Sequence, residues 1–152
     1  MRFFINLLSC CFLLFLITCK EDRDDVAPSV TILEPVENET YNVLESVGIK
    51  ANVSDNNKVE SVRISLISEA TNNQVLSSKT FVVNLKEAVV EHVIELSDSL
   101  LETGRYYLRA EAFDGENYLS GFRFIKINGI QKKKLGIIVS CANGATTDVY
   151  LD

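Results

Sequence analysis

Apolar and polar residues divide this 152-residue chain into three zones. Residues 3–17 are apolar except at two positions, and residues 20–25 are all charged. Through most of residues 28–127, apolar residues alternate with polar ones, without a helical period of useful length. A period of two predicts β-strands with one buried face, because successive side chains of a strand point to opposite sides.

The third zone contains seven predicted strands separated by polar turns such as Asp55-Asn56-Asn57 and Asp114-Gly115. Their ranges are 30–33, 47–54, 59–66, 75–85, 88–96, 105–112 and 122–127. Seven short strands with turns at this spacing favour an all-β fold of the β-sandwich type.

The alternation also predicts which side chains face the core. Inward residues are expected to include Phe81, Val83 and Leu85, then Ala88, Val90, His92, Ile94 and Leu96, then Tyr106, Leu108, Ala110 and Ala112. In the last strand the apolar residues change from even-numbered to odd-numbered positions after Phe124, which predicts a β-bulge. Tyr106 is a candidate for the tyrosine corner of sandwich folds, in which the hydroxyl bonds to backbone a few residues upstream.

Three segments of this zone carry a resemblance. They are Pro28-Ser29-Val30-Thr31-Ile32-Leu33-Glu34-Pro35, Val47-Gly48-Ile49-Lys50-Ala51-Asn52-Val53-Ser54-Asp55 and Gly104-Arg105-Tyr106-Tyr107-Leu108-Arg109-Ala110-Glu111-Ala112-Phe113-Asp114-Gly115. Together they resemble bacterial immunoglobulin-like domains over roughly residues 27–127. The resemblance implies an immunoglobulin-like β-sandwich of about seven strands. In such families the module is a spacer, stalk, adhesin repeat or carbohydrate-binding unit, so the fold alone assigns no activity.

The first zone predicts a cleaved export signal. Arg2 precedes an apolar run that is shorter than the roughly 18 to 20 residues a membrane-spanning helix needs. The run ends in Leu16-Ile17-Thr18-Cys19, which resembles the lipobox of bacterial lipoproteins. Thr18 departs from the Gly, Ala or Ser usual at that position. The resemblance implies removal of residues 1–18, lipid attachment such as palmitate at Cys19, and a membrane as partner; a plain signal peptide is the alternative.

The charged residues after Cys19 indicate a location. Lys20-Glu21-Asp22 is similar to the export signal that sends lipoproteins of the Bacteroidota to the outer face of the outer membrane. The resemblance implies a lipid-anchored protein facing the cell exterior, with a periplasm-facing location as second choice. The charges also suit a solvated flexible tether over residues 19–27, because such segments cannot bury enough apolar surface to fold.

Charge and cysteine content exclude several classes of function. The chain has a net charge of −6. Removal of residues 1–18 removes Arg2 and makes the net charge more negative by one. Nucleic acid is therefore not expected as a partner, because binding phosphates needs a clustered positive surface. With Cys19 lipidated, Cys141 would be the one free thiol of the mature chain, so neither a disulfide nor a cysteine-spaced zinc site is expected.

No catalytic set accompanies the single histidine. His92 has no nucleophile or carboxylate at motif spacing, whereas general-base catalysis needs an oriented partner. The sequence therefore predicts a structural histidine, no catalytic residues, no cofactor and no enzyme activity.

Three weaker patterns point to binding or modification. Asp55 and Asp114, with Glu34 or Glu116, are candidates for a calcium site, although the same aspartates suit hydrogen-bonded turns. Ser99, in Asp98-Ser99-Leu100, resembles the O-glycosylation motif of Bacteroidota. The outward residues Tyr107, Arg109 and Phe113 suit stacking on a sugar and indicate a surface for protein or glycan partners; the glycan-binding candidates are Tyr107, Phe113 and Tyr118.

The last 25 residues differ in character. After the basic run Lys132-Lys133-Lys134, residues 135–140 and 146–151 are predicted strands with Asn143-Gly144 in the turn, which favours a β-hairpin. Residues 128–152 are thus expected to form a linker and hairpin, either docked on the sandwich or opening a truncated, propeller-like second β domain.

These patterns favour a non-enzymatic spacer or interaction module on a surface-anchored lipoprotein, with the sandwich at residues 28–127. Two alternatives remain. One is a glycan-binding lipoprotein of a polysaccharide-uptake system, and the other is the N-terminal part of an enzyme whose catalytic domain is missing.

Overall fold

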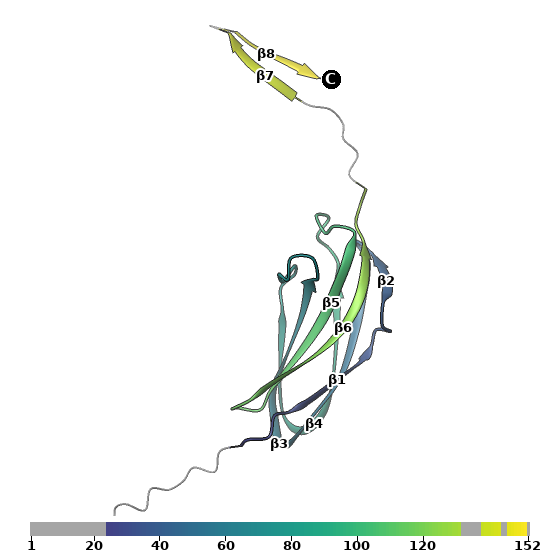
Figure 1. The fold of residues 1–152 in the computed structure, drawn as a ribbon, viewed down its shortest axis with the longest axis vertical. Coiled ribbons are helices and arrows are strands. Elements are labelled where there is room, and N and C mark those ends of the chain that lie inside the picture. Colours follow the sequence, from purple (N-terminus) through teal and green to yellow (C-terminus); the bar gives the residue numbers. More distant parts are fainter. Residues whose placement is uncertain (1–23, 132–137, 144–145, 152) are drawn as a thin grey trace, which may run out of the picture.

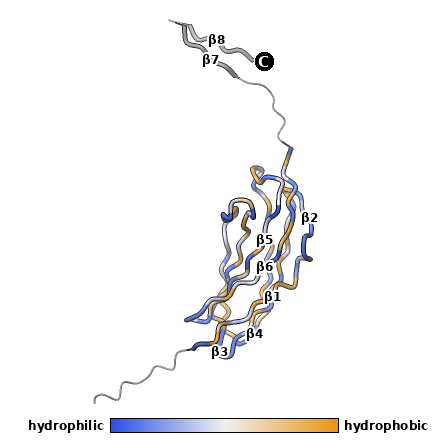
Figure 2. The backbone as a smooth tube through the Cα atoms, viewed as in Figure 1, coloured by the Kyte–Doolittle hydropathy of each residue, from blue (hydrophilic) through white to orange (hydrophobic). Residues whose placement is uncertain are grey.

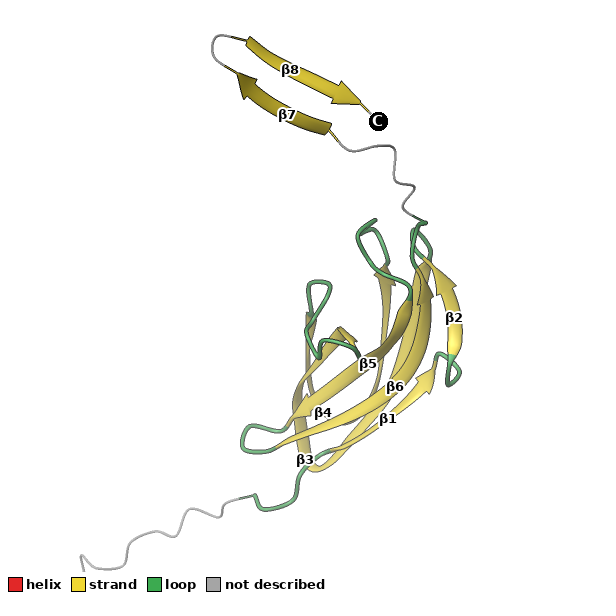
Figure 3. Ribbon diagram, turned by 45° about the horizontal axis from the view of Figure 1, so that its top comes forward, coloured by secondary structure: helices red, strands yellow, loops and turns green. Residues whose placement is uncertain are grey.

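The computed structural model describes residues 24–131, 138–143 and 146–151, and this part of the chain contains strands and no helix (Figure 1, Figure 3). Its strands are β1 (Ser29–Glu34), β2 (Glu39–Asn42), β3 (Ser46–Ser68), β4 (Lys79–Glu95), β5 (Gly104–Phe113), β6 (Tyr118–Asn128), β7 (Ile138–Asn143) and β8 (Thr146–Leu151). Over the same residues, we find no helix of the length and apolarity that crossing a bilayer requires.

Strands β3 and β4 are long and contribute to both layers of the fold. Residues 46–54 of β3 pair with β1 and with residues 87–95 of β4. Residues 61–68 of β3 pair with β5, and residues 79–85 of β4 pair with β3 on its other side. β5 pairs with β6, which pairs in parallel with β2. The six strands thus form one curled sheet that closes into a two-layer sandwich (Figure 1).

The all-β sandwich predicted from the alternation is confirmed. All seven predicted strands are present, but the second and third are joined into β3, and the fourth and fifth into β4. The joins coincide with a shift in register between Ser54 and Val59, where the chain bends from one layer to the other. At this bend the Asp55 carboxylate accepts hydrogen bonds from the backbone of Asn57 and Lys58, so the predicted turn acts as a bend within a continuous strand.

Two predictions of side-chain direction were wrong. Leu85 is 57% exposed, because Asn84 has a positive φ of 54° and the register shifts beside it, which reverses the direction of the next side chain. In β6 no bulge is present: pairing with β5 is continuous from Ile127 to Tyr118. Phe122 and Phe124 therefore lie on the outer face, opposite in direction to the buried residues that come after them.

The core lies between the inner faces of the two layers. Fully buried residues come from β3, β5 and β6 and from the end of β4, including Val47, Val53, Val62, Ile64, Leu66, Leu96, Leu108, Ile125 and Ile127. The predicted inward rows of β5 and of the second half of β4 are confirmed. Figure 2 shows the resulting alternation of apolar and polar positions along the strands.

An arginine and a glycine join the two layers where β1 approaches β6. Arg123 occupies an inward position of β6, donates to the Ile32 carbonyl and forms an ion pair of 3.3 Å with Glu37. Gly121 lets β1 come close, because a Cβ atom there would lie only 3.0 Å from Val30 Cγ1. These contacts add to the burial of Ile32 in the core and help to join β1 to β6.

Tyr106 forms the predicted tyrosine corner. Its ring is 4% exposed, and its hydroxyl donates a hydrogen bond of 2.7 Å to the carbonyl of Glu102, four residues upstream. Burial raises the pKa of the Tyr106 hydroxyl, so this group stays a neutral donor at physiological pH. The bond fixes the connection between β4 and β5.

Replacing Tyr106 by phenylalanine should lower the free energy of unfolding by about 1–2 kcal/mol, because the ring still fills the core while a partly buried carbonyl loses its donor. Urea denaturation followed by far-UV circular dichroism measures the change. Tyr118→Phe is the matched control, since that ring is 63% exposed. Equal stability of the Tyr106 variant and the wild type would show that the corner bond contributes nothing net.

The chain enters and leaves the sandwich at opposite ends (Figure 1). We call the end with the β5–β6 turn and the start of β1 the N-terminal end, and the end where β6 finishes the C-terminal end. At the N-terminal end, Asn117 Nδ2 donates to the Asp24 carbonyl at 2.8 Å, and Asn56 Nδ2 donates to the Asp24 carboxylate at 3.3 Å. Pro28, four residues further along, is fully buried.

The C-terminal end is held by Gly129. Its backbone N–H donates to Thr103 Oγ1 at 2.9 Å, and a Cβ atom at Gly129 would lie 2.5 Å from the Leu101 carbonyl oxygen. Only glycine fits this position without moving backbone. The segment that leaves β6 is therefore packed against the β4–β5 connection that Tyr106 also holds.

The predicted C-terminal hairpin is present. β7 and β8 pair antiparallel over residues 138–143 and 146–151 as a separate two-stranded sheet. Within the described residues the first strand covers Ile138–Asn143, and residues 135–137 of the prediction lie outside them. The second strand matches the predicted range.

Candidate functional site

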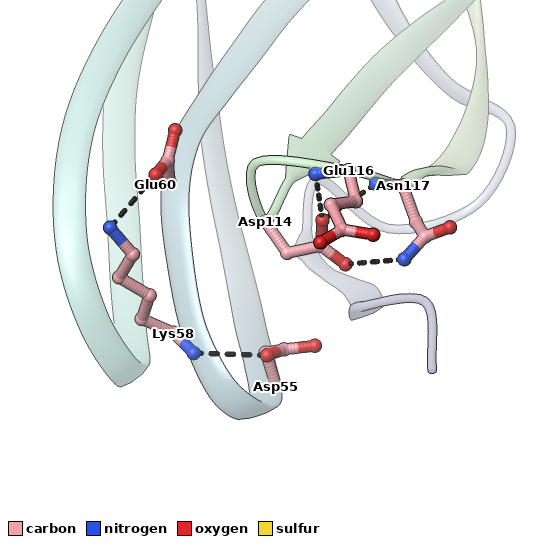
Figure 4. A network of polar contacts seen from close by, with 6 residues as sticks. All are labelled: Asp55, Lys58, Glu60, Asp114, Glu116 and Asn117. Atoms are coloured by element: carbon pink, nitrogen blue, oxygen red, sulfur yellow. Dashed lines mark hydrogen bonds and ion pairs between the residues drawn. The ribbon is translucent and has the colours of Figure 1, made fainter. Parts of the chain in front are cut away.

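The two calcium candidates lie at the N-terminal end of the sandwich (Figure 4). Asp114 is 8% exposed and accepts hydrogen bonds from the backbone N–H groups of Glu116 and Asn117 at 2.7 and 2.6 Å. Burial alone would raise the pKa of the Asp114 carboxyl, but these bonds and one from the Asn117 side chain outweigh burial and lower it. The contacts of Asp114 are those of a turn-forming aspartate.

Asp55 has the equivalent role at the bend of β3, where its Oδ1 accepts from the backbone of Asn57 and Lys58 at 2.8 and 3.0 Å. Nearby, Lys58 forms an ion pair of 2.8 Å with Glu60. Among the described residues, no group of three or more His, Cys, Asp or Glu side chains is placed to hold a metal ion. Backbone hydrogen bonds thus account for Asp114 and for Oδ1 of Asp55, whereas Oδ2 of Asp55 is buried without a hydrogen-bond partner.

His92 lies on the inner side of β4, where the strand faces its own first half. Its ring makes an edge-to-face contact with Phe81, with 5.4 Å between ring centroids. Burial, with a smaller contribution from the charge of Lys79, lowers the pKa of His92. A neutral imidazole packed on an aromatic ring is a structural element of the sandwich.

The predicted modification sites differ in what the structure describes of them. Ser99 is exposed in the turn after β4, where the Asp98 carboxylate accepts a hydrogen bond of 2.8 Å from the Leu100 N–H. Cys19 and the charged residues Lys20, Glu21 and Asp22 lie outside the described residues. Lipidation, export and glycosylation therefore stay predictions.

The three glycan candidates share one surface, the outer face of the layer built by β5, β6 and the second half of β3. Phe113 and Tyr118 are cross-strand partners whose rings stack with 4.3 Å between centroids. Tyr107 lies on the same face toward the other end of β5, where its hydroxyl donates to Asn72 Oδ1 at 2.5 Å. At about 3.3 Å per residue, Tyr107 and Phe113 are roughly 20 Å apart along β5.

The structure adds two aromatic residues to this face that were not among the glycan candidates. Phe122 and Phe124 of β6 flank Tyr107, with ring centroids 5.7 and 5.8 Å from it. The guanidinium of Arg105 lies 5.0 Å from the centroid of Phe124. The residues Tyr107, Phe113, Tyr118, Phe122 and Phe124 form a surface that we call the aromatic face.

Arg109 lies at the centre of the aromatic face. Its cross-strand neighbours are Phe122 on β6 and Ser65 on β3. Its Nε is buried without a hydrogen-bond partner, and so is the Oγ of Ser65, whose side chain is 1% exposed. The alternation had already placed Arg109 outward beside Tyr107 and Phe113, and the structure adds that its Nε has no hydrogen-bond partner.

A comparison with protein families agrees with the architecture. A family model described as "Bacterial Ig domain" matches residues 28–110, and no curated protein matches the chain. Fibronectin(III)-like modules of Clostridium thermocellum CbhA are similar in structure, with 19% identity and a TM-score of 0.47, over 68% of this chain and 100% of that chain. A β-glucuronidase from Parabacteroides merdae is 16% identical with a TM-score of 0.39, over 70% of this chain and 15% of that chain.

Proposed function

Because this chain belongs to the bacterial Ig domain family, with an immunoglobulin-like β-sandwich as its fold, we propose that it is a surface-anchored lipoprotein whose sandwich is a spacer and interaction module. Domains of this kind are non-catalytic modules, and their function depends on the segments they carry and the partners they bind. The proposed organisation is a signal peptide over residues 1–18, a tether over residues 19–27, the sandwich over residues 28–127, and a linker with hairpin over residues 128–152.

One observation carries the spacer role: the chain is held at both ends of the sandwich, and these ends lie on opposite sides of the domain (Figure 1). A strand of 11 residues such as β6 is about 35 Å long. Contacts at Asp24 and Gly129 resist fraying at both ends, so the domain can transmit a fixed separation of about that size. A module with both ends on one side would not separate its N-terminal tether from its C-terminal linker.

The anchor supports the same interpretation. Cys19 precedes Asp24 by five residues, and an extended chain spans at most about 3.6 Å per residue. The N-terminal end of the sandwich would then stand within about 18 Å of a lipid attached to Cys19. The C-terminal end, with residues 128–152 beyond it, would point away from the membrane.

Trypsin treatment of intact cells that express the protein tests surface exposure. Trypsin cleaves after Lys20 and Arg23, directly before the first residue held on the sandwich. We expect the sandwich to be released into the supernatant, while a soluble periplasmic protein remains intact.

A variant with Lys20→Ala, Glu21→Ala and Asp22→Ala is the matched comparison, because it keeps Cys19 and the Arg23 cleavage site. Loss of the export signal should leave this variant in the cells and protected from trypsin. Protection of the wild type, or equal release of both proteins, would contradict the surface location.

A further inference from the structure

The aromatic face carries a charge opposite to that of the protein. In the register of β3, β5 and β6, its outward charged side chains are Arg63, Arg105, Arg109, Glu111 and Lys126, four of them cationic. The outer face of the other layer carries Lys50 with Glu87, Glu91 and Glu95. Glu111 and Glu69 compensate Arg63 and Arg105, which leaves Arg109 and Lys126 as the cations of this surface without an ion pair among the described residues, in a chain of net charge −6. Such a surface attracts anionic ligands.

Arg109 differs from the other arginines of the described residues. Arg63 forms an ion pair of 2.6 Å with Glu111, Arg105 one of 3.1 Å with Glu69, and Arg123 one of 3.3 Å with Glu37. Within the described part of the chain, the guanidinium of Arg109 has neither an ion pair nor a hydrogen bond; its Nε is buried without a partner, as is the Nε of Arg123. A guanidinium with unused donors in a fixed position suits bidentate recognition of a carboxylate.

Exposed rings lie on either side of this arginine. Phe122, directly opposite Arg109, is 53% exposed, and Tyr118 at the N-terminal end of the face is 63% exposed. Beside Tyr118, a shallow groove is lined by two hydroxyl side chains, an ion pair and two aromatic rings: Ser61, Thr80, Arg63, Glu111, Phe113 and Tyr118. Ring surfaces next to hydroxyl and charged groups provide both kinds of contact that a sugar ring uses, apolar C–H faces and hydrogen bonds.

We propose that the aromatic face binds an acidic glycan, with Arg109 pairing with the carboxylate of a uronic acid whose ring packs on Phe122. Tyr107, Arg109 and Phe113 extend over about 20 Å along β5. This length suits an extended polymer rather than one small molecule. The groove beside Tyr118 would take a neighbouring sugar unit. This inference rests on the proposed role of the sandwich as an interaction module, and it names the class of ligand that the module binds.

Isothermal titration calorimetry of the full chain in detergent, with polygalacturonate as the probe, tests the assignment. We expect binding by the wild type and a loss of affinity of about tenfold or more in Arg109→Gln, because a charge-assisted bidentate pair is removed. Arg109→Lys keeps the charge but loses the planar fork, and should also bind more weakly than the wild type. Phe122→Ala should weaken binding through loss of the stacking surface.

Lys50→Gln is the matched control, because it removes one positive charge from the opposite layer and should bind like the wild type. Carboxyl-reduced polygalacturonate, which is neutral, should not bind. The proposal is overturned if the wild type does not bind polygalacturonate, if Arg109→Gln binds as tightly as the wild type, or if the reduced polymer binds equally. Such a result would rule out the acidic glycan as ligand. It would not affect the proposal of an anchored spacer, because trypsin release from cells does not depend on Arg109.

Discussion

Replacing Leu108 by alanine should lower the free energy of unfolding by about 2–5 kcal/mol, the range for a fully buried leucine that leaves a cavity. Leu108 is 0% exposed in the middle of β5, where it pairs with Leu66 of β3 and with Arg123 of β6. It therefore joins the inward rows of three neighbouring strands. A domain of this size is stable by about 5–15 kcal/mol, so the substitution would remove a large share of its stability.

Urea unfolding followed by far-UV circular dichroism measures this effect. Val82→Ala serves as the control, because Val82 is also a strand residue but is 78% exposed, and its loss should change stability by no more than about 0.5 kcal/mol. Similar midpoints for the two variants would show that the sandwich core is not where the structure places it.

Alternation along the chain predicted seven strands and most of the core, but it missed the short strand β2 (Glu39–Asn42), which pairs with β6. The rows that begin at Val47 and Tyr106 keep one parity from start to finish, and both are buried as expected. The alternation predicted the wrong direction for the Leu85 side chain, because the positive φ of Asn84 reverses the direction of the next side chain without any change in the apolar pattern. It also could not show that the turn at Asp55 is a bend within one long strand, since that depends on which strands pair on either side.

The candidate binding surface was predictable only in part. Outward parity identified Tyr107 and Phe113 correctly, because both belong to the regular row of β5. Phe122 was not predicted for this face, because the change of apolar parity after Phe124 was interpreted as a β-bulge, and only the continuous pairing of β6 with β5 places it there. Outward parity also placed Arg109 on this face, but only the folded chain shows that the other arginines of the described residues have carboxylate partners while Arg109 has none.

Replacing Cys19 by alanine should abolish lipid attachment altogether, which is the largest effect expected for any single substitution in this chain. Burial of acyl chains contributes about 0.8 kcal/mol per methylene, so several chains on one cysteine anchor a protein durably. Without the thiol no thioether can form, and the protein has no other attachment point that the sequence predicts. The sandwich itself should fold unchanged, because residue 19 precedes the segment that is held at Asp24.

Metabolic labelling with an alkynyl fatty acid tests whether Cys19 carries the lipid anchor. The wild type and Cys141→Ala, which loses a thiol far from the signal peptide, should both take up the label, whereas Cys19→Ala should take up none. Equal labelling of Cys19→Ala and the wild type, or no labelling of the wild type, would contradict the anchor and with it the proposal of a lipoprotein spacer.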